Sequence, residues 1–348
     1  MQFLVALSLT LHLQLQTPIA DLITTLDEAE AYLVVNPAHS LTLLAQPVFG
    51  NDTPPELKLR HAVLTTRAAV PTNQLGKVII AVDDAFQYVE LPAFKQHLTA
   101  LTSALGIWLR RNQYLLEAKQ SLECAVKHAT STRQQLTLLN SLGLVARQLD
   151  DNALAKQLFS HVQLLAEQSE LPGLVAIASN NLGLLALDEG NIKAAEPHLR
   201  AALKQYQLLN QRAGIISAGI NLLFYFVLQN EETNFVRLYT PTETLTKSFP
   251  NEAKQALLDW LRLAFQHNKG FLLSDAQKSA LADSFSKLED IKVQQQVARY
   301  LAPKLGVPVS HLMLPAQHPK AFDRPWFHYV AQCAWPAEAE LPAQAFTQ

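Results

Sequence analysis

The chain has 348 residues, of which 49% are hydrophobic and 17% charged, so it can bury a sizeable core. Its formal net charge is −2, which provides no overall field to draw the protein onto nucleic acid or an anionic membrane, and no nucleic-acid partner is expected. Only 11 residues are glycine, which disfavours tight β-turns and phosphate-binding loops and favours helices.

Residues 1–20 have the layout of an export signal. An apolar run from Phe3 to about Leu15 precedes Ala20, a small residue suited to cleavage. The alternative is a half-buried strand, because polar and apolar residues alternate from Ser8 onward. We expect a periplasmic or otherwise extracytoplasmic location, with a cytoplasmic one as the alternative. No later stretch of about 18 uncharged apolar residues exists, so no other membrane span is expected.

Residues 21–96 are predicted to form degenerate helical hairpins. Apolar residues recur at helical spacing from Leu22 to Leu33, and Asn36-Pro37 begins a second helix with proline in its first turn. Two further helices are predicted, at residues 56–69 and 76–89. The segment resembles the degenerate first repeat of extracytoplasmic sensor regions in some bacterial signalling proteins, which implies an exported bacterial protein.

A repeat with a period of 37 to 40 residues occupies residues 97–240. It is marked by Leu-Gly pairs at Leu105-Gly106, Leu142-Gly143 and Leu182-Gly183. Twelve residues beyond each glycine stands an alanine, and four residues later a bulky apolar side chain: Ala118 and Leu122, Ala155 and Phe159, Ala195 and Leu199. A fourth copy begins at Leu222, and Pro241 is expected to break its second helix.

Each copy is predicted to be two antiparallel helices joined by a polar turn, with Asn152 and Asn191 as N-caps of the second helices. The glycine and the alanine mark a close approach between the two helices. One such unit cannot cover its own apolar face, so neighbouring units must stack.

This pattern resembles the tetratricopeptide repeat (TPR) in its Leu-Gly pair and in the small and bulky residues that follow. The spacing exceeds that family's usual length of about 34 residues, and its characteristic Trp, Tyr and Pro are mostly missing. The resemblance implies an all-α fold, a right-handed α-solenoid of about six or seven helical hairpins. It also implies a binding surface on the concave face.

The C-terminal part divides into further helices at 241–305 and a Pro- and aromatic-rich segment at 306–348. Helical periodicity is found at 252–266, 275–287 and 291–305. Seven of the 18 prolines fall within the last 46 residues, together with Trp326 and Trp335. We expect part of this segment to pack against the last helices as an irregular cap; the alternative is an exposed aromatic docking peptide.

No catalytic or cofactor motif is found, so neither enzyme activity nor a cofactor is expected. Cys124 and Cys333 are 209 residues apart and belong to no CxxC pair; buried thiols are favoured over a disulfide. The tail histidines have spacings that match no metal site: His311, His318 and His328. No metal is expected, and an enzyme without a recognisable motif is the remaining alternative.

Candidate peptide-binding residues lie on the first helix of each repeat, beside the Leu-Gly pair. The asparagines among them, whose amides can grip a peptide backbone, are Asn140, Asn180, Asn181 and Asn221. The arginines, which can clamp a carboxylate or a phosphate, are Arg110, Arg111 and Arg147. Alternatively, the asparagines satisfy polar groups between repeats and the arginines are solvated. Apolar positions nearby, Leu144, Leu184 and Phe224, fit core packing and ligand contact equally well.

The sequence therefore predicts a non-catalytic scaffold that binds a protein or peptide partner through its concave face. The TPR and sensor resemblances imply an exported bacterial module for sensing or assembly. The alternative is a cytoplasmic regulator or structural adaptor that binds through its convex side or its aromatic C-terminal tail. The oligomeric state is left open.

Overall fold

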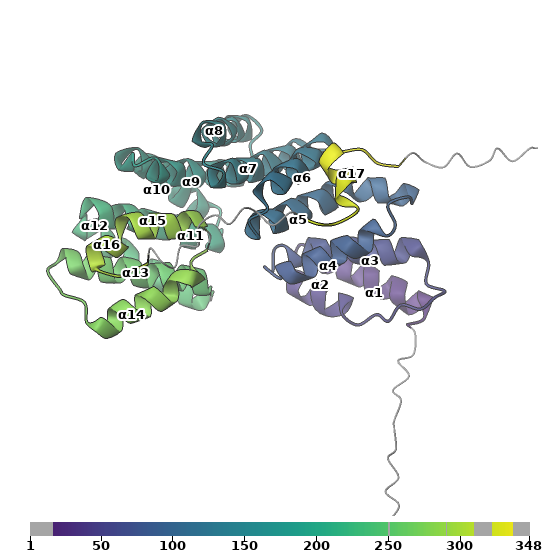
Figure 1. Ribbon diagram of the computed structural model, residues 1–348, viewed down its shortest axis with the longest axis horizontal. Helices are drawn as coiled ribbons and strands as arrows, with labels where there is room; N and C mark the ends of the chain where they lie inside the picture. Colours follow the sequence, from purple (N-terminus) through teal and green to yellow (C-terminus); the bar gives the residue numbers. More distant parts are fainter. Residues whose placement is uncertain (1–16, 250, 290, 310–321, 337–348) are drawn as a thin grey trace, which may run out of the picture. The chain divides into compact units, whose positions relative to one another are not determined.

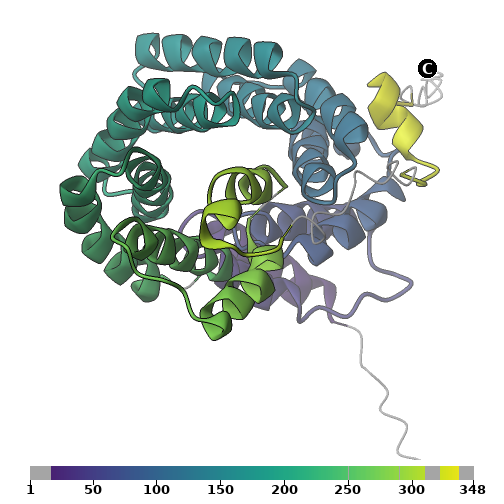
Figure 2. The same ribbon diagram turned by 60° about the vertical axis from the view of Figure 1, so that its left-hand side comes forward.

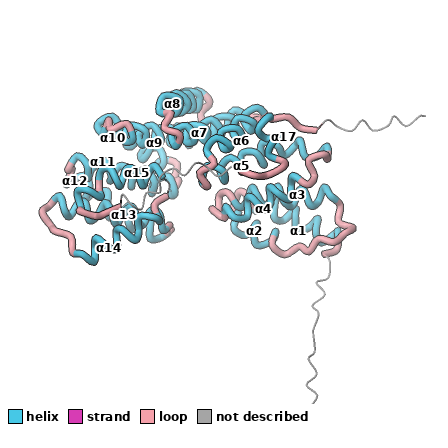
Figure 3. The backbone as a smooth tube through the Cα atoms, in the orientation of Figure 1, coloured by secondary structure: helices cyan, strands magenta, loops and turns pink. Residues whose placement is uncertain are grey.

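The computed structural model describes residues 17–309, except 250 and 290, and residues 322–336 (Figure 1). Within these ranges the chain forms seventeen α-helices and two 3-10 helices and no strand (Figure 3). The predictions for residues 1–16, and those for His311 and His318, lie outside the described residues. The chain divides into two compact units, one of Met1–Trp108 with Pro325–Gln348 and one of Leu109–Arg324.

The first unit is built from short helices that pack in pairs. Asn36 caps the second helix by accepting a hydrogen bond from the His39 amide at 3.1 Å, with Pro37 as the first helical residue. Its elements are α1 (Ile19–Tyr32), α2 (Pro37–Leu44), α3 (Pro55–Ala69), α4 (Leu75–Phe86), η1 (Pro92–His97), most of α5 (Leu98–Arg111) and α17 (Phe327–Gln332).

The tail segment at residues 325–336 packs within this first unit. The Trp326 ring stacks on Phe86 with 4.1 Å between ring centroids, and its Nε1 donates a hydrogen bond to Asp83 at 2.9 Å. The Trp335 ring lies 5.7 Å from that of Phe94. Packing against the last helices was expected; the structure instead offers these rings apolar faces on α4 and η1 and an acceptor for the indole N–H.

The second unit contains the repeats, and its helices run nearly antiparallel in pairs (Figure 2). Its elements are α6 (Leu115–Lys127), α7 (Thr132–Gln148), α8 (Asn152–Gln168), α9 (Pro172–Asp188), α10 (Ile192–Leu208), α11 (Arg212–Gln229), α12 (Glu232–Ser248), α13 (Glu252–Asn268), α14 (Asp275–Ser284), η2 (Phe285–Lys287), α15 (Ile291–Tyr300) and α16 (Ala302–Leu305). The predicted all-α solenoid is confirmed.

Glycine and a bulky side chain meet inside the hairpins as the repeat predicted. A Cβ added to Gly143 would clash with the Phe159 ring and would lie 2.8 Å from its Cδ1. A Cβ on Gly183 would lie 2.6 Å from Leu199 Cδ2. Because Phe159 and Leu199 are fully buried, the missing side chain is what lets the two helices of each hairpin pack this closely.

Three local predictions need correction. Pro241 does not end its helix, since α12 continues to Ser248, and burial of apolar side chains such as Phe235 offsets a cost of about 3 kcal/mol for an internal proline. The cap of α8 is Asp151, whose carboxylate accepts from the Leu154 amide at 3.1 Å, and Asn152 already lies inside the helix. Asn191 stands at the N-cap of α10 without a side-chain capping bond.

Helix α11 is more apolar than the sequence analysis allowed for. By length and composition, this 18-residue helix is the one described helix that could cross a membrane, with a mean hydropathy of 1.3. Of its residues, 61% are buried inside the protein. Its apolar character is accounted for by its position in the core, between α9, α12 and α13.

Candidate protein-binding face

The first helices of the repeats, α7, α9 and α11, form one continuous surface of the second unit, which we call the inner face. Figure 2 shows these helices on the inner side of the curve of repeats and α8, α10 and α12 on its outer side. All seven predicted site residues lie on first helices or on the last turn of α5.

The four asparagines form two hydrogen-bonded pairs that join neighbouring repeats. Asn181 Nδ2 donates to Asn140 Oδ1 at 2.8 Å, and Asn221 Nδ2 donates to Asn180 Oδ1 at 2.9 Å. All four side chains are buried. Amides in such positions need partners, and here each supplies the other's. The amides thus bridge one repeat to the next, while their contact with a peptide stays a prediction.

Two of the three arginines bind carboxylates of the chain itself. Arg147, only 3% exposed, forms a two-pronged ion pair with Asp188, with distances of 2.5 Å from Nε to Oδ2 and 3.2 Å from Nη2 to Oδ1. Arg111 Nη2 lies 3.5 Å from Glu289 Oε1, and its Nη1 donates to the Glu289 carbonyl at 3.3 Å. Arg110 is buried. The predicted arginines therefore do bind carboxylates, and these carboxylates are Asp188 and Glu289 of the same chain.

Helix α15 lies on the inner face, within the curve of the repeats (Figure 2). Lys292 forms an ion pair with Asp150, which directly follows α7. Gln296 Nε2 donates to Asp188 Oδ1 at 2.7 Å, at the end of α9. Arg299 Nη1 donates to the Asp188 carbonyl at 3.0 Å, and the Tyr300 hydroxyl donates to the Leu187 carbonyl at 3.0 Å. One side of α15 thus binds the C-terminal ends of successive first helices.

The segment entering α15 is fixed by charge. Lys254 Nζ lies 2.5 Å from Glu289 Oε2, and its positive charge lowers the pKa of the Glu289 carboxyl to about 2, outweighing burial, which raises that pKa. The charges of Arg111 and Arg110 act in the same direction. Glu289 is therefore a carboxylate at every physiological pH.

Sequence reasoning missed the groups that meet on this face: Asp150, Asp188, Glu289, Lys292 and Gln296. The sequence pattern predicts a polar turn between the two helices of each repeat and a helix at 291–305, without assigning them a shared contact. A signal was present, because Lys292, Gln296 and Arg299 recur at intervals of four and three residues and form a polar stripe on one side of a helix. Nothing in that stripe says which surface it covers.

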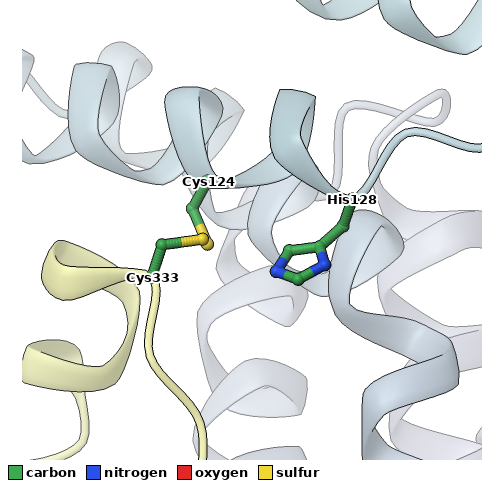
Figure 4. A group of neighbouring side chains, drawn as sticks. All are labelled: Cys124, His128 and Cys333. Carbon is green, nitrogen blue, oxygen red and sulfur yellow. The ribbon is translucent and has the colours of Figure 1, made fainter.

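The cysteines are not free thiols. Cys124 lies in α6, and His128 follows it four residues later at the end of that helix (Figure 4). Both Cys124 and Cys333 are disulfide-bonded, which corrects the expectation of buried thiols; their separation in sequence carried no signal for pairing. Because a disulfide sulfur is not the thiolate that binds metals, we assign no metal site to Cys124 and His128.

One sizeable cavity lies beside α15 and α16, with a volume of about 440 Å³. The described residues that line it are mainly apolar, and Arg299 is the ionisable one among them.

Comparison with known proteins gives weak likenesses. No protein-family model matches the sequence, and no curated protein matches it significantly. The solved structure of a Rap protein complexed with competence and sporulation factor has 10% identity over 83% of this chain and 98% of its own, with a TM-score of 0.40. Aspartyl phosphate phosphatase F from Bacillus subtilis has 12% identity over 88% and 98%, with a TM-score of 0.44. BtubC from P. vanneervenii has 14% identity over 78% and 98%, with a TM-score of 0.31. At these values the likenesses carry no argument about function.

Proposed function

We propose that this protein is a non-catalytic scaffold that binds a peptide or protein segment on the inner face of its repeats. The observation that carries the proposal is the placement of α15. Helix α15 binds near the C-terminal ends of α7 and α9. Its Lys292 pairs with Asp150, and its Gln296 donates a hydrogen bond to Asp188. A surface with acceptors repeated at the repeat spacing is suited to hold a peptide segment that crosses several repeats.

The alternative surfaces are less well supported. The aromatic tail residues Trp326 and Trp335 are engaged with Phe86 and Phe94 in the first unit. On the second helices, Leu164 and Leu208 are exposed, but they stand at isolated positions. Binding through the outer surface is therefore the second candidate.

Site-specific photo-crosslinking distinguishes these surfaces. A photoreactive amino acid is placed at Leu144 or Leu184 on first helices, and at Leu164 or Leu208 on second helices as matched controls. With the full chain in its source cell, we expect the same partner to be crosslinked from the first pair and not from the second. If only Leu164 and Leu208 gave crosslinks, the partner would bind the outer surface and the proposal would be wrong.

We further propose that the protein is exported and serves sensing or assembly outside the cytoplasm. Support comes from the disulfide-bonded state of Cys124 and Cys333, since disulfides persist in oxidising compartments. Native protein treated with an alkylating reagent before reduction should gain no adduct, and after reduction it should gain two. Two adducts before reduction, or an intact mass that retains the first twenty residues, would favour a cytoplasmic protein.

A further inference from the structure

Building on the proposed function, we infer that α15 occupies the surface to which the partner binds and makes the same kind of contacts as the partner. The partner is an amphipathic helix with cationic and amide groups at the spacing found in α15, and it binds by displacing α15 from the inner face.

The first support is the match between a helix and the repeats. Lys292, Gln296 and Arg299 lie on one side of α15, and their acceptors are contributed by two successive first helices. From Lys292 to Gln296 a helix rises about 6 Å, while packed helices lie about 8–10 Å apart. The side chains of Lys292 and Gln296 are long enough to make up the roughly 2–4 Å by which the helix spacing exceeds this rise. A helix with this pattern can therefore bind two successive repeats.

The second support is charge complementarity. From Ile291 to Tyr300 the segment carries Lys292 and Arg299 and no acidic residue. The side chains that receive it, Asp150 and Asp188, are acidic. Arg147 already pairs with Asp188, so the inner face favours a cation opposite Asp150 and an amide donor opposite Asp188.

The third support is the contrast between this contact and those between repeats. The repeats are held together by fully buried apolar groups, such as Phe159 against Gly143. Toward the inner face, α15 presents Lys292 and Gln296, which are buried and hydrogen-bonded. Contacts of this kind can be exchanged for equivalent ones from another helix at little net cost. Val297 of α15 is also fully buried, in the same core as Leu187 of α9 and Phe224 of α11, so a competing helix must also bring an apolar side.

The test uses the full chain and a fluorescent peptide copying residues 288–305. In a host variant carrying Lys292→Ala and Gln296→Ala, α15 loses the two buried side chains that bind it to Asp150 and Asp188. We expect this variant to bind the peptide at least tenfold more tightly than the wild type. Gln295→Ala, an amide change on the same helix at a residue that lines the outer cavity, is the matched host control and should behave as wild type.

The peptide has its own control. A peptide with Lys292→Glu faces Asp150 with like charge and should bind neither host. Equal binding of the unmodified peptide to wild type and variant would overturn the inference, as would no binding to a variant that keeps its helical circular dichroism. Dimerisation of the variant, seen by light scattering, would overturn the assignment to a partner, because the occupant would then be α15 of a second copy.

Hydrogen exchange in the wild type keeps the inference testable if the variant fails to fold. Amides of α15 should exchange at least tenfold faster than those of α9, because α15 opens without unfolding the repeats. Equal protection of α15 and α9 would overturn displacement. Photo-crosslinking of a partner from Leu144 and Leu184 does not depend on this result, so failure of the inference is distinguishable from failure of the proposed function.

Discussion

Replacing Gly143 by alanine tests the packing on which the hairpins depend. The added Cβ would clash with the Phe159 ring, which is fully buried. Overpacking of this kind lowers the free energy of unfolding by about 1–3 kcal/mol. The higher helix propensity of alanine relative to glycine offsets this by about 1 kcal/mol. Because the clash is with a ring rather than a flexible chain end, we expect the free energy of unfolding to fall by about 1–2 kcal/mol.

The assay is urea unfolding of the full chain followed by far-UV circular dichroism, with Gly173→Ala as the matched control. Gly173 lies in α9 of the same unit, and its added Cβ would meet only the end of the Gln211 side chain, 3.2 Å away, which can move aside. The control should therefore be neutral or slightly stabilising. A Gly143→Ala protein that resists urea as well as the wild type would refute the close-packing argument.

Three further predictions concern single contacts. Asn181→Ala leaves the buried Asn140 carbonyl oxygen without its partner and should lower the free energy of unfolding by about 1–3 kcal/mol; the Asn140→Ala and Asn181→Ala double-mutant cycle should be non-additive, and strict additivity would exclude the bridge. The lowered pKa of Glu289 means that its ion pair stabilises the fold above the unfolded-state pKa of about 4.3 and is lost as the pH falls toward 2; thermal melts of Glu289→Gln should therefore differ from wild type at pH 7 and coincide near pH 2, and an undiminished gap at pH 2 would contradict this. Pro241→Ala restores a donor inside α12 at an exposed position and should raise the free energy of unfolding by about 1–2 kcal/mol in the same urea assay, whereas a loss would show that the proline is needed there.

The hairpins were predictable because their determinants are local and repeated. The offset from Gly143 to Phe159 recurs between Gly183 and Leu199, and each pair marks one close approach of two helices. The helix start at Pro37 also followed from Asn36-Pro37, which lie next to each other in sequence. Such signals survive in a single sequence because each needs only a few neighbouring residues.

The occupant of the inner face could not be predicted in the same way. Lys292 and Asp150 are 142 residues apart. The chain has many surface carboxylates, and the sequence does not show which of them a given lysine contacts. The stacking of Trp326 on Phe86 spans the chain similarly. For the asparagines, sequence identified the positions and left two roles open, since an amide that grips a peptide and an amide that bridges repeats have the same chemistry.

The distance along the chain between the inner face and α15 also has a consequence for synthesis. The ends of α7 and α9 are complete at Asp188, whereas Gln296 is added 108 residues later. At a translation rate of about 5–20 residues per second, the repeats are exposed without α15 for roughly 5–20 s. During that interval a nascent chain presents Asp150 and Asp188 to any helix nearby, and a partner that arrives then meets no competitor.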